Sequence, residues 1–369
     1  MAIFLISVCA IGILIFILPY LLISANPFPN PSGKWQVGTS DLTWDKPDLS
    51  GIIAKVWYPT EIENNTPAPY IDDIDLTLSA ITEGMESSMP PLINLLAKLI
   101  FNQRYFDRVR TPISRGALPS RIPEGFPVIL LSPGFGGINF LNTFYALEFA
   151  SHGFVIIGIN HPGFSAVTML TDRAYVGLAE TSKELLGDII NNFDRLAGQF
   201  AIEQAENISA IVDKVICLNS SSDSFLYQII NENRIFAVGH SSGGFASFIT
   251  CGIDRRVSKG VNLDGAFIDA DFTNYESKKL LLIQADRHKL SENNKKIKSL
   301  LDRDEVQIEK LSTRASLQKR SLRLSNHLDF TDLPLIINLA FAKAIGLTSE
   351  VGGLKFLKET AAVVIDFLT

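Results

Sequence analysis

Short apolar runs, separated by polar and glycine-containing segments, recur along most of the chain. Such runs are typical of strands that are buried on both faces of a parallel sheet. They span residues 126–131, 154–160, 235–238, 261–265 and 278–285. Residues 35–42 and 51–59 predict two earlier strands joined as a hairpin, and residues 139–151 and 175–217 predict helices. This alternation predicts a doubly wound, mostly parallel α/β sheet.

The pattern is weaker in two other parts of the chain. Residues 60–120 interrupt the strands, so we expect a lid-like insertion around them. Within it, residues 89–101 are apolar and compatible with a core helix, or equally with a lid or membrane-surface helix. Near the end, residues 305–310 and 321–324 favour a last pair of strands. Residues 333–369 predict two closing helices.

The first 25 residues differ from the rest of the chain. Residues 2–23 contain no charged side chain, and about 22 residues at 1.5 Å rise can cross a bilayer core. No Lys or Arg precedes Lys34, which argues against a secretory signal, although Ser24 and Ala25 could end a cleavable one. We therefore expect residues 1–25 to form a transmembrane anchor or, as the alternative, a signal segment. The protein is then membrane-anchored, or secreted or periplasmic if the segment is cleaved.

Three prolines follow within residues 26–33, which predicts an extended linker over residues 26–34. Residues 35–369 then form the main domain. The 369-residue chain is 47% hydrophobic and 20% charged, with a net charge of −6, so nothing favours nucleic acid as a partner. Its three cysteines include no CxxC pair, so a zinc site or disulfide framework is not expected. At most one bridge, Cys217 to Cys251, could form.

The chemistry centres on residues 239–243, which read Gly-His-Ser-Ser-Gly. An apolar strand precedes this G-x-S-x-G motif, and a small, apolar helix start follows it. Strand, sharp turn and helix are the context of a nucleophile elbow, which lifts the Ser241 hydroxyl above the sheet edge. Ser242 cannot be the motif serine, because His240 rather than Gly stands two residues before it. We therefore expect Ser241 to be a nucleophile.

Two backbone amides are candidates for an oxyanion hole. The run 126–131 leads into a glycine-rich loop, Ser132-Pro-Gly-Phe-Gly-Gly137, of the kind that provides one oxyanion N–H in acyl-transfer enzymes. We expect that donor to be Phe135, because glycines flank it and let the backbone turn inward. The second donor is the residue after the nucleophile, Ser242.

A serine needs a base, and the base needs an acid that orients it. Five histidines are present, and His327 is the candidate base because it comes late, after an expected strand. Ser241, an acid and His327 then occur in the chain order of an α/β-hydrolase. Asp264 and Asp286 each end an expected strand on the same edge, so position alone leaves the acid open.

Six segments carry a resemblance to a known family. The sequence resembles the platelet-activating factor acetylhydrolase family of α/β-hydrolases in residues 31–42, 131–137, 150–155, 239–244, 263–265 and 327–332. The resemblance implies an α/β-hydrolase catalytic domain over residues 35–369. It also implies that Asp264 is the triad acid and that Phe135 and Ser242 are the oxyanion donors. The chain departs from the family pattern at Pro133 and Ser242, both beside the expected acyl site.

These residues predict a serine esterase that works through an acyl-enzyme and needs no metal or organic cofactor. The expected substrate is a carboxylic ester, such as a short-acyl phospholipid or other lipid ester, with membrane contact through the N-terminal segment. A broad carboxylesterase or dienelactone-type hydrolase is the alternative enzyme. A non-catalytic binding protein that retains the fold is the alternative outside enzymes.

Overall fold

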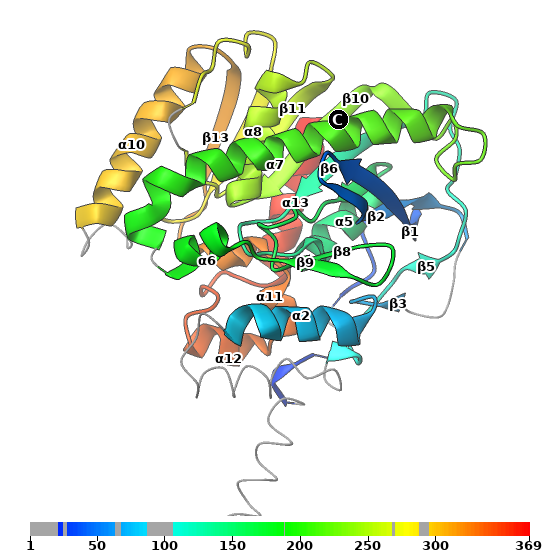
Figure 1. Ribbon diagram of the computed structural model, residues 1–369, viewed down its shortest axis with the longest axis horizontal. Coiled ribbons are helices and arrows are strands. Elements are labelled where there is room, and N and C mark those ends of the chain that lie inside the picture. The colour runs from blue at the N-terminus through cyan, green and yellow to red at the C-terminus, as the bar shows by residue number, and fades with distance from the viewer. Residues whose placement is uncertain are drawn as a thin grey trace, which may run out of the picture.

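A nine-stranded sheet runs through the molecule in the order β13-β12-β11-β10-β6-β7-β2-β1-β5 (Figure 1). The computed structural model describes residues 21–24, 28–62, 68–86, 106–187, 189–267, 270–287 and 295–369. The strands are β1 Gln36–Lys46, β2 Leu49–Thr60, β5 Ser114–Arg115, β6 Phe126–Ser132, β7 Val155–Gly158, β10 Ile230–His240, β11 Val257–Leu263, β12 Lys279–Gln284 and β13 Ser316–Ser321. From β13 to β7 neighbouring strands are parallel, and β2 and β1 continue as an antiparallel hairpin. The predicted hairpin and mostly parallel α/β sheet are therefore confirmed.

Helices cover both faces of this sheet (Figure 1). The α-helices described are α2 Ile74–Glu86, α5 Thr143–Ser151, α6 Glu180–Gly187, α7 Ile189–Ser220, α8 Ser242–Ile253, α10 Lys295–Ser312, α11 Leu333–Ile336, α12 Leu339–Ala344 and α13 Leu354–Leu368. Two 3-10 helices, η1 Asn139–Asn142 and η2 His327–Phe330, and two small sheets, β3 Ala68–Pro69 with β4 Arg110–Thr111 and β8 Val167–Met169 with β9 Tyr175–Gly177, complete the fold. Helices α5 and α13 pack on one face, and α7, α8 and α10 pack on the other.

The continuous apolar runs are explained by these two layers. Successive side chains of a strand point to opposite faces. In β10, Phe236 and Val238 therefore join the core beneath α5 and α13, whereas Ile235 and Ala237 join the core beneath α7 and α8. Because both faces are covered, every position from Ile235 to Val238 is apolar and buried. The carboxyl ends of these parallel strands meet at one edge of the sheet.

Element predictions were wrong in two places. Residues 175–177, expected as part of a helix, form strand β9. Residues 305–310, expected as a strand, lie inside helix α10. The buried side chains Asp304, Gln307, Ile308 and Leu311 are spaced three and four apart, which is the helical period. The last strand is β13, a few residues earlier than expected, and it pairs in parallel with β12. The closing region contains α13 and two short helices, α11 and α12.

The N-terminal region is only partly described. Leu22 and Ile23 are buried, and Ile23 forms an antiparallel bridge with Ile337 beside α12. Most of the predicted anchor, residues 1–20, and the apolar segment 89–101 lie outside the described residues. Among the helices described, none is both long and apolar enough to cross a bilayer. Cys217 and Cys251 are both free thiols.

Candidate active site

The turn between β10 and α8 has the geometry of a nucleophile elbow. Ser241 follows β10 directly, adopts φ 56° and ψ −127°, and caps the N-terminus of α8. A non-glycine residue rarely adopts this conformation, which costs on the order of 1–3 kcal/mol. The turn also needs glycine at Gly243, where a Cβ would collide with the carbonyl of Pro133. The strained turn leaves the Ser241 hydroxyl at the carboxyl edge of the sheet.

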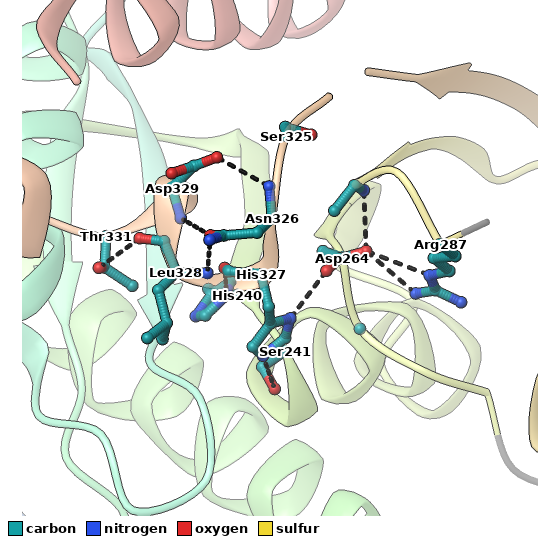
Figure 2. A network of polar contacts seen from close by, with 12 residues as sticks. His240, Ser241, Asp264, Arg287, Ser325, Asn326, His327, Leu328, Asp329 and Thr331 are labelled. Carbon is teal, nitrogen blue, oxygen red and sulfur yellow. Dashed lines mark hydrogen bonds and ion pairs between the residues drawn. The ribbon is translucent and has the colours of Figure 1, made fainter. Parts of the chain in front are cut away.

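His327 joins Ser241 to Asp264 by two hydrogen bonds (Figure 2). Its Nδ1 lies 2.7 Å from Oδ2 of Asp264, and its Nε2 lies 3.0 Å from Oγ of Ser241. A carboxylate only accepts, so Nδ1 carries the proton and Nε2 accepts from the hydroxyl. The structure thus brings together three predicted residues from β10, the end of β11 and η2. Their arrangement can activate an alcohol for attack on an ester carbonyl.

The carboxylate of Asp264 is buried and held at both oxygens. Oδ1 accepts from the Ala285 amide at 2.9 Å and from Nε and Nη2 of Arg287, each at 3.2 Å. Burial disfavours its charged form, but the hydrogen bond with His327 and the charge of Arg287 outweigh burial. The pKa of Asp264 is therefore lowered, and the group stays ionised.

The other candidate acid lies elsewhere. Asp286 accepts from the Leu324 amide at 2.9 Å, and its own amide donates to the carbonyl of Ser325. Its neighbour Arg287 turns inward to Asp264 and to Asp304 on α10. Sequence reasoning missed this contact of Arg287. Only the fold, which brings α10 beside the end of β12, reveals it.

His240, inside the elbow, supports the neighbouring histidine. Its Nε2 donates to the main-chain carbonyl of His327 at 2.9 Å, and the two rings lie 4.5 Å apart. Burial, together with the proximity of His327, lowers the pKa of His240 to about 3. A neutral His240 therefore fixes the backbone that carries His327.

The glycine-rich loop passes directly beside the serine. A Cβ at Gly134 would lie 2.9 Å from Cβ of Ser241, so only glycine allows this approach without displacement. Phe135 is the next residue, and the following Gly136 donates its amide to the carbonyl of Phe164 at 2.8 Å. Ser242 begins α8, where the first amides have no acceptor within the helix. Both expected oxyanion donors therefore belong to segments that border Ser241.

The segment after His327 is anchored at both ends. Asn326 and Asp329 form a reciprocal capping box around η2. Asp332 accepts from the amides of Thr143 and Phe144 at 2.8 and 3.1 Å and so caps α5. Burial raises the pKa of Asp332 to about 7 despite these bonds. The acidic residues of the 327–332 motif therefore hold the histidine in place.

Aromatic side chains border the glycine-rich loop. The ring of Phe135 stacks on Phe200 of α7 with centroids 5.5 Å apart, and Phe164 packs on Phe200 at 4.8 Å. Phe164 and Phe200 are buried. The loop thus carries an apolar cluster, which suits the acyl or alkyl part of an ester.

The chain is similar to several known proteins. A family model described as "Platelet-activating factor acetylhydrolase, isoform II" matches residues 22–187 and 200–369, which is most of the chain. The "Platelet-activating factor acetylhydrolase" of Canis lupus familiaris is 23% identical over 300 residues, which cover 76% of this chain and 65% of the relative. The "Probable 1-alkyl-2-acetylglycerophosphocholine esterase" of Arthroderma benhamiae is 26% identical over 142 residues, covering 38% of this chain and 32% of the relative. The chain thus aligns with less than two thirds of the length of these curated relatives.

A solved structure shares the fold. The ferulic acid esterase from Streptomyces cinnamoneus superimposes with a TM-score of 0.60 at 19% identity, over 92% of this chain and 90% of that one. At this identity the likeness shows a common fold.

Proposed function

Because the chain belongs to the platelet-activating factor acetylhydrolase, isoform II, family, we propose that it is a serine esterase. The main observation that supports this proposal is the series of hydrogen bonds from Ser241 through His327 to Asp264. The single neutral imidazole has one nitrogen for the hydroxyl and the other for the carboxylate, as acyl transfer requires.

The proposed reaction has two steps. His327 takes the proton of Ser241, whose Oγ attacks the ester carbonyl, and His327 then protonates the leaving alcohol. Water repeats the cycle on the acyl-enzyme and releases the acid. The amides of Phe135 and Ser242 are the proposed donors to the oxyanion. The residues of the chain are sufficient for these steps.

The proposed substrate is a lipid ester with a short acyl chain. The names of two relatives, an acetylhydrolase of platelet-activating factor and a probable esterase of 1-alkyl-2-acetylglycerophosphocholine, support this class. Phe135, which packs on the buried Phe164 and Phe200, is a partly exposed apolar side chain beside the loop and also fits this class. Turnover of esters with graded acyl length separates this substrate from those of a broad carboxylesterase.

The first prediction tests the nucleophile. Ser241→Ala removes one exposed oxygen, so it should abolish ester hydrolysis and labelling by a fluorophosphonate while the fold remains intact. Steady-state ester assays, labelling and circular dichroism check this. Near-full activity in the variant would show that the elbow serine is not the nucleophile. Labelling of the unaltered chain also excludes a non-catalytic binding protein.

The second prediction concerns location, which we propose to be a membrane reached through the uncharged segment 1–25. The attachment is hydrophobic, so the full chain should sediment with membranes and stay there in high salt. A chain that starts near Asn26 should be soluble and active. A soluble mature protein whose N-terminus follows Ala25 would instead indicate a cleaved, secreted form.

A further inference from the structure

Arg287 is the one cation that contacts the carboxylate of Asp264 among the residues described (Figure 2). Its Nε and Nη2 bond to Oδ1, while His327 bonds to the other oxygen, Oδ2. Together with the Ala285 amide, Arg287 therefore prevents the carboxylate from rotating away from the imidazole. This contact fixes the direction in which Asp264 presents Oδ2 to His327.

An arginine at this place also has an electrostatic cost. The role of the acid is to stabilise the imidazolium that forms when His327 takes the serine proton. A lone Arg287 would neutralise Asp264 and leave that imidazolium without a counter-charge. The arrangement would then orient the base but weaken it.

Asp304 offsets this cost. Its Oδ2 accepts from Nη1 of Arg287 at 2.5 Å, and its Oδ1 accepts from the Phe267 amide at 2.7 Å. The side chains of Asp264, Arg287 and Asp304 are 5%, 16% and 4% exposed, so solvent screens their charges weakly. Burial raises the pKa of Asp304 to about 6, so above that pH two carboxylates and one guanidinium leave one net negative charge beside His327. The cluster becomes neutral when His327 is protonated.

We propose that Arg287 is a positioning residue and that Arg287 and Asp304 together set the pH range over which His327 serves as the base. The inference rests on the proposed esterase function. Among the residues described, the charged groups that face Arg287 are Asp264 and Asp304, and those facing Asp264 are His327 and Arg287. The titratable group that faces His327 from the elbow is His240. Glu305, next to Asp304, pairs with Lys319 on β13 and is largely exposed.

The test measures the pH profile of kcat/KM and locates its acid limb, the pH range in which activity falls as His327 becomes protonated. Arg287→Gln removes a positive charge that lies across one carboxylate from the imidazole, so His327 should hold its proton to higher pH. We expect an upward shift of about one pH unit. Asp304→Asn removes a negative charge that lies farther from the imidazole, beyond Arg287, so it should move the limb downward by a smaller amount. The double variant should return toward the original profile.

A matched control exists at the other end of α8. Arg256 bridges two carboxylates in the same way, those of Asp254 and Asp213. Helix α8 has 12 residues and therefore places this cluster about 18 Å from Ser241. Arg256→Gln should lower the melting temperature and leave the pH profile unchanged. A loss of packing alone cannot move two profiles in opposite directions.

Several results would overturn the inference. Profiles of Arg287→Gln and Asp304→Asn that match the original enzyme, or that shift in one direction, would do so. If Arg287→Gln does not fold, Arg287→Lys should keep the original limb, and Asp304→Asn must still lower it. The titration of the His327 ring by NMR, in the Ser241→Ala background, should show the same shifts without turnover. An inert unaltered enzyme overturns the proposed function itself, whereas an active enzyme with unmoved limbs overturns only the role of Arg287.

Discussion

Two clusters in this molecule have nearly the same composition and lie at opposite edges of the sheet. Arg256 bridges Asp254 and Asp213 near the start of β11, and Arg287 bridges Asp264 and Asp304 at its end. In the first cluster Asp213 is 70% exposed and Arg256 is 37% exposed. In the second cluster both carboxylates are nearly buried.

The difference between the clusters lies in the third partner. Asp254 also accepts a hydrogen bond from the neutral hydroxyl of Ser209 on α7. Asp264 uses its second oxygen on His327, whose charge changes during the proposed reaction. The same ion pair therefore contributes to the helix packing at one edge and to the strength of a base at the other. Partners and burial, rather than residue types, decide what an arginine between two aspartates does.

The largest expected effect comes from replacing the corresponding carboxylates of the two clusters, Asp264 and Asp254. Asp264→Asn should keep the fold but lower kcat on the order of 10⁴-fold, because an amide no longer fixes the tautomer of His327 or stabilises its charged form. Asp254→Asn should leave kcat unchanged and reduce the free energy of unfolding by about 1–3 kcal/mol, because Arg256 loses a partner. Steady-state ester kinetics and denaturant unfolding measure the two quantities.

Asp286→Asn is the control for chain position, since Asp286 also follows a strand on the catalytic edge. It should change kcat little, because its carboxylate bonds to the Leu324 amide. A large loss of kcat in Asp286→Asn with a small loss in Asp264→Asn would assign the acid to the end of β12. The bonding of Ser241 to His327 would be unaffected by that result.

A smaller effect concerns stability in acid. Burial lowers the pKa of His161 and of His240 to about 3, below the ordinary value of 6.5. Both histidines are neutral in the folded state, whereas in the unfolded state they are protonated below about pH 6.5. Their contribution to the free energy of unfolding is therefore complete above pH 6.5 and is lost as the pH falls toward 3. Each accounts for up to about 4 kcal/mol over that range. Asp254 has a lowered pKa, so the Arg256 cluster weakens only below about pH 4, near the ordinary value of 3.8.

Unfolding measured between pH 4 and 8 tests this contrast. His161→Gln and His240→Gln should each reduce stability at pH 8 and flatten its fall between pH 6.5 and 4. Arg256→Gln should reduce stability at pH 8 without changing that slope. An unaltered slope in both histidine variants would place the acid sensitivity elsewhere in the chain.

Features that depend on residues close together in the sequence were predictable, whereas features that depend on tertiary contacts were not. The elbow at Ser241 was predictable because strand, turn and helix are consecutive, and the parallel sheet because its strands are uniformly apolar. Residues 305–310 were predicted wrongly because alternation over six residues also fits one side of an amphipathic helix. The choice between Asp264 and Asp286 rested on a resemblance, because the distance to His327 depends on tertiary structure. The role of Arg287 was missed for the same reason.

The capping of η2 has a consequence for biosynthesis. Asp329, two residues after His327, accepts from the amide and hydroxyl of Ser349 at 3.0 and 2.5 Å and from the Thr348 hydroxyl. The elbow is complete by residue 253, but its base acquires this support only when residues 348–349 have been synthesised. A nascent chain on the ribosome would therefore carry the nucleophile for about a hundred residues before the base is secured. Ser241, the proposed nucleophile, therefore acquires a fully supported base only after residue 349 has been added.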